Sequence, residues 1–500
     1  MICYTNQIQL RRRGILYKTI FGMSMLRILP YIIVFLFTLN HPGDTDLGWH
    51  LKYGEYFFKT GNILRENTFS SEMPDYRWVN SSWVTDLITY QTYQNVGFIG
   101  LSVLGALIIT TTFFLTARTF RFTLWQETIT FPVLLFLMDP VLSVSFRGQL
   151  LSFLFLSFLY FILKRYSEGK RRTLLVIPIL FLAWSNIHGQ FILGIFLLGL
   201  WLIVITARNR SKHLLEKICV FFASLGTTLV NPFGLGIYQE SLKHFGSPVQ
   251  KYVLEWLPFD QFSNLWWYLV IWVGIISISV FIFRRKLGVY LPLIICWVVL
   301  TVPSFWMKRY AWPMYLTAAP LFAYLVGHFA PKNLKIQKYL PLTVLGLLYV
   351  SVALIKLPNA QITRMNWDTY CRVSIQCTKD SAEFLISHPP SEKYLTFYNW
   401  GGWLIWNYPQ IKPSVDGRMH LWRDDETGYS PFEKYFYLEQ NITDIEQSEY
   451  SYVYIATFKP LYKRLKELVT ENKWEILYED ENAAIFRRNT LVLYKYPSLH

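Results

Sequence analysis

The chain has 500 residues, of which 53% are hydrophobic and 16% are charged, whereas soluble domains carry roughly 25% charged residues. Its formal net charge of +15 comes largely from short basic blocks between apolar runs. Basic residues are not interleaved with exposed aromatics, so the composition argues against a nucleic-acid partner. Charges are sparse from about residue 98 to 355 and dense from about 357 to the end, which predicts a membrane domain at 1–356 and a soluble domain at 357–500.

Eleven apolar runs are candidates for membrane-spanning helices, each of which needs about 20 mostly apolar residues. The first run follows a basic segment that has no small-residue cleavage site, so we expect a retained span and not a removed signal peptide. The predicted fold class is therefore an α-helical polytopic membrane protein with about eleven transmembrane helices. The runs lie at 24–40, 98–117, 127–146, 149–163, 172–188, 190–207, 214–231, 265–283, 287–304, 310–327 and 339–356.

The basic blocks assign an orientation to these spans. One block, Arg11 to Arg13, precedes the first span, and later blocks follow every second span. Because lysine and arginine concentrate in cytoplasmic loops, we expect the N-terminus on the cytoplasmic side of a bacterial inner membrane. The first loop (41–97) and the C-terminal domain (357–500) are then extracytosolic. The later blocks lie at 118–121, 164–172, 208–217, 284–286 and 328–338.

The C-terminal domain alternates helical and strand-like stretches, which predicts a small α/β domain. Cys371 and Cys377, six residues apart on the expected outer side, predict a disulfide. The tryptophans at 400, 403, 406 and 422 favour packing in a core, and a carbohydrate-binding surface is the alternative. Helices are expected at 380–387 and 461–469, and strands at 394–398, 412–415, 451–458, 474–478 and 483–487.

The first outer loop begins with two carboxylates at a membrane edge, in the sequence Asp44-Thr-Asp46-Leu-Gly-Trp-His50. If a helix starts near Asp46, His50 lies one turn later on the same face. Two interpretations stay open. The acids cap this helix among interfacial aromatics, or Asp44, Asp46 and His50 form a catalytic base or a carboxylate pair for a divalent metal such as Mg or Mn. Further along, the aromatics at 78–86 suit a helix lying on the membrane surface.

Other polar residues lie at the predicted outer ends of the spans, where ionisable groups are costly and usually face a cavity. We therefore expect one outward-opening cavity walled by carboxylates, imidazoles, amides and cations. Arg147, Lys308 and Arg309 are suited to a phosphate, so a phosphate-linked lipid and a hydroxyl acceptor fit this set. The candidate substrate-binding residues are Arg147, Gln149, Asn186, His188, Asn231, Glu255, Lys308 and Arg309.

An acidic motif in the first outer loop, about eleven spans and a C-terminal outer domain resemble the C-type glycosyltransferase (GT-C) superfamily. This superfamily includes protein O-mannosyltransferases and aminoarabinose transferases. More closely, most of the chain is similar to a group of bacterial polytopic membrane proteins. The motifs that carry this similarity are Asp44-Thr-Asp46-Leu-Gly-Trp49-His50-Leu, Arg147-Gly-Gln149-Leu-Leu-Ser152, Trp184-Ser-Asn186-Ile-His188-Gly189, Asn231-Pro-Phe-Gly234, Glu255-Trp256, Asn399-Trp400-Gly401-Gly402-Trp403-Leu404 and Asp416-Gly417-Arg418.

The resemblance implies a polyprenyl-phosphate sugar as donor, an acceptor on the extracytosolic side, and a catalytic acid in the first loop. That acid corresponds here to Asp44 or Asp46. The chain departs from the mannosyltransferases, which have an adjacent Asp-Glu pair where this sequence has Asp-Thr-Asp. Both the partner geometry of the acid and its metal dependence therefore stay open.

The leading hypothesis is a membrane glycosyltransferase that moves a sugar from polyprenyl phosphate to a hydroxyl of a glycan, lipid or protein, with His50 supporting the acid. The alternative is a non-catalytic membrane protein that assists polysaccharide assembly or binds carbohydrate. A secondary transporter is disfavoured because the sequence has no convincing internal repeat. The Asp416-Gly417-Arg418 segment is expected to form a turn that docks the outer domain onto the bundle.

Overall fold

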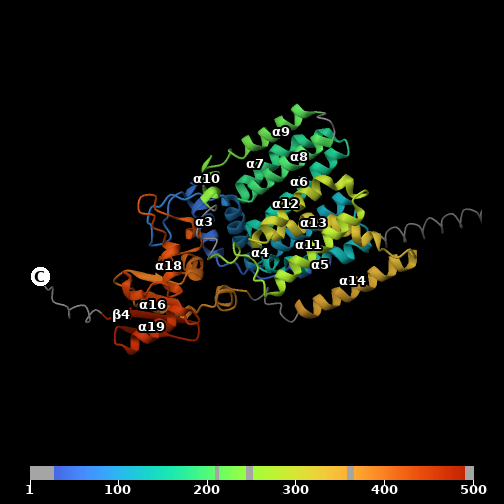
Figure 1. Ribbon diagram of the computed structural model, residues 1–500. Coiled ribbons are helices and arrows are strands. Elements are labelled where there is room, and N and C mark those ends of the chain that lie inside the picture. The colour runs from blue at the N-terminus through green and yellow to red at the C-terminus, as the bar shows by residue number, and fades with distance from the viewer. Residues whose placement is uncertain (1–26, 209–212, 244–251, 357–364, 490–500) are drawn as a thin grey trace, which may run out of the picture.

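The computed structural model describes residues 27–208, 213–243, 252–356 and 365–489. A bundle of helices carries a smaller C-terminal domain on one side, and α3 (Leu47–Thr60) contacts both (Figure 1). Each of the eleven apolar runs contains a helix, although positions 24–26 of the first run lie outside the described residues. The bundle helices are α2 (Leu29–Thr38), α4 (Trp83–Phe120), α5 (Leu124–Leu142), α6 (Gly148–Ser167), α7 (Ile177–Ile187), α8 (Phe191–Arg208), α9 (Leu214–Thr227), α11 (Asn264–Phe283), α12 (Leu291–Ser304), α13 (Lys308–His328) and α14 (Leu334–Lys356).

The bundle helices differ in length. Among the described residues, five segments are long and apolar enough to cross a membrane by length and composition. The predicted spans at 172–188 and 287–304 both open with a short 3₁₀ turn, before α7 and α12 respectively. The structure is thus that of a polytopic helical protein, and the number of eleven crossings stays a prediction. The five segments are Trp83–Phe120, Gly148–Ser167, Phe191–Arg208, Asn264–Phe283 and Leu287–Ser304.

The surface of α11 is what a lipid-facing helix presents. Ile271, Ile278 and Ile282 are each more than half exposed, whereas Trp272 and Ile276 on the other face are buried. A helix that is apolar all round is buried in a protein core or in a membrane. Because one face of α11 is open, that face belongs in contact with lipid.

The long helix α4 is bent at Gly97, whose φ of 67° is a conformation that glycine adopts readily and other residues rarely adopt. The bend separates residues 83–96 from the apolar remainder. It falls between the surface helix predicted near 78–86 and the span predicted at 98–117. A single glycine therefore marks where the first loop ends.

The C-terminal domain is built around a four-stranded sheet with the order β1-β2-β4-β3. β1 and β2 are parallel, whereas β4 pairs antiparallel with both β2 and β3. Four of the five predicted strands and both predicted helices are present. The elements are α15 (Trp367–Tyr370), α16 (Lys379–Ser387), β1 (Tyr394–Thr396), α17 (Gly401–Asn407), α18 (Pro431–Glu439), β2 (Tyr452–Ala456), α19 (Pro460–Thr470), β3 (Trp474–Glu479) and β4 (Ala483–Arg488).

The strand predicted at 412–415 is wrong. Pro413 has no backbone N–H to donate to a ladder. Its neighbour Ser414 instead joins β1 through side chains: the Ser414 N–H donates to Thr396 Oγ1 (2.9 Å), and the Thr396 N–H donates to Ser414 Oγ (2.8 Å). The segment is therefore held next to β1 without forming a fifth strand.

Three of the four tryptophans noted in the sequence lie in the core of the C-terminal domain (365–489), which is called the outer domain after its predicted orientation. Trp400, Trp403 and Trp422 are buried, and the Trp400 indole donates to the carbonyl of Ile375 (3.1 Å). Their burial agrees with the core-packing interpretation. It contradicts a carbohydrate-binding surface made of these three side chains.

The Asp416-Gly417-Arg418 turn has a docking role, as expected, but it contacts the first loop, whereas the sequence predicted a contact with the bundle. The buried guanidinium of Arg418 binds the Asp416 carboxylate (2.8 Å) and donates to Asn67 Oδ1 and Ser70 Oγ, both at 3.0 Å. Ser70 also donates to Asp416. Cation–π contacts complete the surroundings of the guanidinium, with the rings of Phe69, Trp78 and Trp422 at 4.9, 5.1 and 5.2 Å.

Candidate functional site

Glycines bring the acid motif against the outer domain. A Cβ built on Gly48 of α3 would lie 1.8 Å from the carbonyl oxygen of Gly402 of α17. A Cβ on Gly417 would lie 1.7 Å from Asp46 Oδ1. Only glycine allows so close an approach of two backbones. The acids therefore lie at the contact between the first loop and the C-terminal domain.

Arg147 links two carboxylates at the edge of the bundle. It precedes α6, and its Nε lies 3.2 Å from Asp44 Oδ2 while its Nη1 lies 2.5 Å from Glu255 Oε1. The Glu255 carbonyl accepts the N–H of Arg309 (3.0 Å), and the Arg309 guanidinium lies 5.0 Å from the ring centroid of Trp256. Four of the predicted site residues thus form one connected group.

Asp46 lies at the N-cap position of α3, but its side chain makes no cap hydrogen bond. The capping interpretation is therefore wrong for Asp46. Its own N–H donates to Asp44 Oδ1 (3.2 Å), so the Asp44 carboxylate orders the start of the helix. The Asp46 carboxylate lies against Gly417 of the outer domain instead.

His50 follows Asp46 by one helical turn, as the spacing predicts, and its N–H donates to the Asp46 carbonyl (3.2 Å). Its Nδ1 lies 2.5 Å from Oδ1 of the buried Asp86, whose Oδ2 accepts from Asn80 Nδ2 (2.6 Å). Burial would lower the pKa of His50, but the Asp86 carboxylate outweighs burial and raises it. The sequence predicts a surface helix at Asp86 and does not identify this residue as part of the site. The signal that could have identified it is an acidic side chain in the first turn of that helix.

Burial, and then the neighbouring charge of Asp44, raise the pKa of Asp46 to about 6. Burial would also raise the pKa of Glu255, but Arg147 and Arg309 outweigh it and hold that pKa below its usual value. One acid of the site therefore titrates close to neutral pH, while another stays ionised.

A second cluster of polar side chains lies where α6 meets α7. His188 Nδ1 is 2.8 Å from Ser152 Oγ, which also accepts from the indole N–H of Trp184 (2.9 Å). A Cβ on Gly148 would lie 3.0 Å from His188 Cδ2, so this histidine packs beside the start of α6. Gln149 is buried, and within the described part of the chain neither atom of its amide has a hydrogen-bond partner. Such a group is a candidate for a ligand contact.

Three predicted site residues have structural contacts of their own. Asn231 closes a turn with its side-chain amide, and Asn186 Oδ1 accepts from the indole N–H of Trp83 (2.9 Å). The Lys308 ammonium lies 5.9 Å from the ring centroid of Phe259. These contacts do not join them to the group around Arg147.

The outer domain contributes residues that sequence reasoning missed. The Tyr370 phenol donates to the Asp44 carbonyl. The Tyr398 phenol donates to the carbonyl of Gly417 (3.5 Å), and His420 Nδ1 lies 2.9 Å from the same oxygen. No local pattern distinguishes these residues from ordinary core aromatics. They are found only once the two parts of the chain are docked.

Few side chains of the described site could act as ligands of a metal ion. Among the described residues, no three His, Cys, Asp or Glu side chains form a group that could hold a metal ion. Mg²⁺ is commonly bound by one or two carboxylates together with substrate phosphates. Asp44 and Asp46 therefore fit Mg²⁺ only in the company of a phosphate.

No protein-family model and no curated protein matches the chain. The solved structures that resemble it include two of one protein. ArnT from Cupriavidus metallidurans bound to undecaprenyl phosphate is 12% identical with a TM-score of 0.48, and ArnT from the same organism in the apo state is 13% identical with a TM-score of 0.49. Each alignment covers 94% of this chain and 98% of the other. At these identities and TM-scores, the activity of this chain has to be argued from its own residues.

Proposed function

We propose that the chain is a membrane glycosyltransferase that moves a sugar from a polyprenyl-phosphate donor to an acceptor hydroxyl outside the cytosol. The observation that carries this proposal is the connected group in which Arg147 binds both Asp44 and Glu255, with Asp46 two residues further along the same loop. Such a transfer needs a base for the acceptor hydroxyl and cations for the leaving phosphate. This group supplies both.

Asp46 is the residue that we assign as the base. Its pKa of about 6 leaves it ionised at neutral pH, yet basic enough to accept a proton during the reaction. Asp44 is more deeply buried, and its carboxylate already binds Arg147 and the Asp46 N–H. We assign Asp44 to holding Arg147 and the start of α3.

Arg147 and Arg309 are assigned to the donor phosphate. Both lie next to Glu255, which binds the side chain of Arg147 and the backbone of Arg309. The planar fork of a guanidinium suits a phosphate group. The buried amide of Gln149, two residues after Arg147, is assigned to a polar group of the same substrate.

The reaction is a displacement at the anomeric carbon. The acceptor oxygen bonds to that carbon while the carbon's bond to the phosphate oxygen breaks. The proton of the acceptor hydroxyl passes to Asp46, and polyprenyl phosphate leaves with the electron pair, its charge balanced by the arginines. A Mg²⁺ ion, when bound, would be held by the Asp44 carboxylate together with the donor phosphate and would neutralise charge on that phosphate, which leaves Asp46 free to accept the proton. His50, fixed by Asp86, supports the loop that carries the base.

The experiment uses purified full-length protein in lipid nanodiscs, radiolabelled polyprenyl-phosphate sugars and a cell-envelope extract as acceptor. We expect the wild type to transfer label and Asp46→Asn to be at least about 100-fold slower, which is the usual scale of general-base catalysis. Asp75→Asn is the matched control, because Asp75 is an exposed acid of the same loop. A folded wild type that transfers none of the sugars contradicts the proposal and favours a role in polysaccharide assembly.

A further inference from the structure

Two hydroxyl groups of the outer domain hold the backbone of the acid motif. The buried Tyr370 phenol donates to the carbonyl of Asp44, and the Ser374 hydroxyl donates to the carbonyl of Pro42 (3.3 Å). A buried phenol normally finds a partner for its O–H, and here that partner is the peptide group of the acid that binds Arg147. The two carbonyls flank Gly43, so together the hydroxyls fix the path of the chain into the site.

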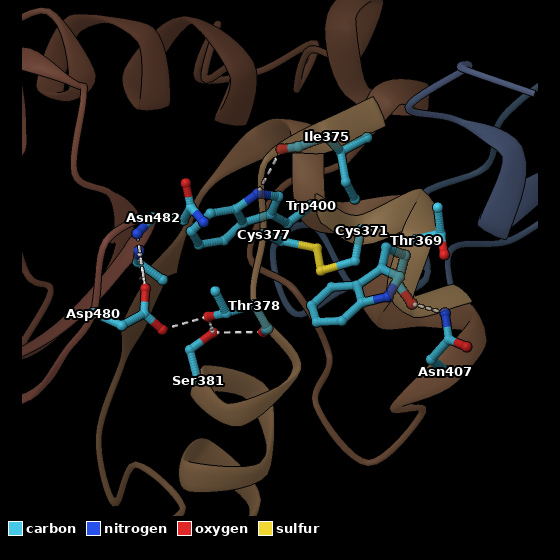
Figure 2. The surroundings of a disulfide bond; sticks show 12 residues. Thr369, Cys371, Ile375, Cys377, Thr378, Ser381, Trp400, Asn407, Asp480 and Asn482 are labelled. Atoms are coloured by element: carbon cyan, nitrogen blue, oxygen red, sulfur yellow. Dashed lines mark hydrogen bonds between the residues drawn. A yellow bond between two sulfur atoms is a disulfide. The ribbon is translucent and has the colours of Figure 1, made fainter. Parts of the chain in front are cut away.

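Ser374 lies on a short turn that a disulfide closes, and Tyr370 directly precedes that turn. Cys371 and Cys377 are bonded six residues apart (Figure 2). Residues Cys371–Ile375 form a single turn of π-helix, and the Cys377 N–H donates to the Cys371 carbonyl (2.9 Å). An isolated π turn is a rare conformation. The covalent bond ties its two ends together next to Tyr370.

The turn is anchored to the rest of the outer domain by other groups. The indole of Trp400 donates to the Ile375 carbonyl (3.1 Å), and Thr378 donates to Asp480 (2.6 Å) from the far side of the disulfide (Figure 2). The sheet therefore does not depend on the disulfide for its attachment to this segment. What the disulfide adds is the shape of the turn between these anchors.

We propose that the Cys371–Cys377 disulfide positions the acid motif: it holds Tyr370 and Ser374 on the carbonyls at 44 and 42, and a dithiol that reduces it releases this hold. The proposal rests on the proposed function for its effect on transfer. A crosslink over six residues constrains the whole chain less than one that closes a long loop, so its effect is local. Reduction passes two electrons and two protons from the dithiol to the protein, giving two thiols and the oxidised cyclic reagent.

The first experiment measures hydrogen exchange and needs no activity. Full-length protein is compared before and after reduction with dithiothreitol, and as the Cys371→Ala/Cys377→Ala variant. We expect amide exchange at 42–48 to rise about tenfold while β2 and β4 keep their protection, because exchange reports local opening. Cys219→Ala, which removes an exposed free thiol of the bundle, is the control. Unchanged exchange at 42–48, or an equal rise in the sheet, overturns the proposal.

The second experiment separates positioning from general stability. Tyr370→Phe removes one hydroxyl and keeps the ring. We expect this variant and the double cysteine variant each to lower kcat about tenfold with KM for the donor within twofold, and the combined variant to be no slower than either, since residues in one network are not additive. Independent, multiplying losses overturn the proposal. A rise in exchange together with a wild type that transfers no sugar rejects the proposed function and leaves the positioning intact.

Discussion

Asp44 and Asp46 are two residues apart, yet their surroundings give them different chemistry. Arg147 lies on the Asp44 carboxylate at 3.2 Å, whereas burial and the charge of Asp44 raise the pKa of Asp46 to about 6. The guanidinium of Arg147 holds the Asp44 carboxylate, and the like charge of Asp44 makes Asp46 a better proton acceptor. The difference comes from the partners and not from the acids themselves.

This difference predicts the pH dependence of transfer. A base acts only when it has lost its proton, so a raised pKa moves the loss of activity upward in pH. We expect kcat/KM to be roughly constant above about pH 7 and to fall about tenfold for each pH unit well below pH 6. Initial rates between pH 4.5 and 8 check this.

The variant Asp44→Asn supplies the control for that profile. It removes the neighbouring negative charge that raises the pKa of Asp46, so the midpoint should move to lower pH even though the maximal rate falls. A profile that is flat down to pH 5 in the wild type would remove Asp46 from the role of base.

At the scale of elements, the contact between α3 and α17 sets the position of the acid loop. Gly48 and Gly402 meet backbone to backbone, and α3 also packs on α4. A helix bearing larger side chains at this contact would stand further from the outer domain. The acid motif at the N-terminal end of α3 would move with it.

We therefore expect Gly48→Ala to destabilise the protein by about 1–3 kcal/mol, the usual cost of overpacking. In an open helix interior the same change would stabilise by roughly 0.5–1 kcal/mol, so the sign of the effect is diagnostic. Gly43→Ala is the control, because a Cβ at Gly43 meets nothing within 4 Å. The measurement is the Tm of thermal unfolding in detergent. An unchanged Tm for Gly48→Ala would contradict the close contact between Gly48 and Gly402.

At the scale of the whole molecule, buried polar groups fasten the outer domain to the first loop. One set of such groups is Arg418 with Asp416, Asn67 and Ser70. In addition, the buried Glu72 of the first loop accepts hydrogen bonds from the phenols of Tyr429 (2.8 Å) and Tyr450 (3.0 Å). Removing one partner of a buried ion pair leaves an uncompensated charge. These groups therefore hold the two parts in a single arrangement.

Arg418→Ala tests this attachment. It leaves Asp416 buried without its cation, so we expect about 3–5 kcal/mol of destabilisation, with less protein in the membrane and a lower Tm. Arg423→Ala is the matched control, because Arg423 is an exposed arginine of the same segment that pairs with Glu433. Lost transfer with an unchanged membrane level and Tm would instead place Arg418 in the reaction.

The predicted orientation is tested by labelling in intact cells. Glu426→Cys in the outer domain and Arg285→Cys in a basic loop both replace exposed residues. In a chain that also carries Cys219→Ser, a membrane-impermeant maleimide should label position 426 directly and position 285 only after permeabilisation. The reverse pattern would invert the assignment made by the positive-inside rule.

By itself the sequence determined the helical segments, most of the sheet of the C-terminal domain, the single helical turn from Asp46 to His50 and the pairing of Cys371 with Cys377. These features depend on hydropathy and on residue spacing within a short stretch of chain, so they can be predicted without knowing the tertiary contacts. The wrong strand prediction at 412–415 shows the limit of such local patterns. There Pro413 cannot donate a backbone hydrogen bond, and the side chains of Thr396 and Ser414 replace the backbone hydrogen bonds of a strand pair.

Only the tertiary structure decided which candidates meet. Asp44 finds Arg147, His50 finds Asp86, and Tyr370 finds the Asp44 carbonyl, across separations of 103, 36 and 326 residues. Hydropathy cannot rank such partners, since Lys308 and Arg309 are equal candidates by composition yet lie in different contacts. Contacts of this range depend on how the bundle, the first loop and the outer domain close on one another, because each partner is held by a different element.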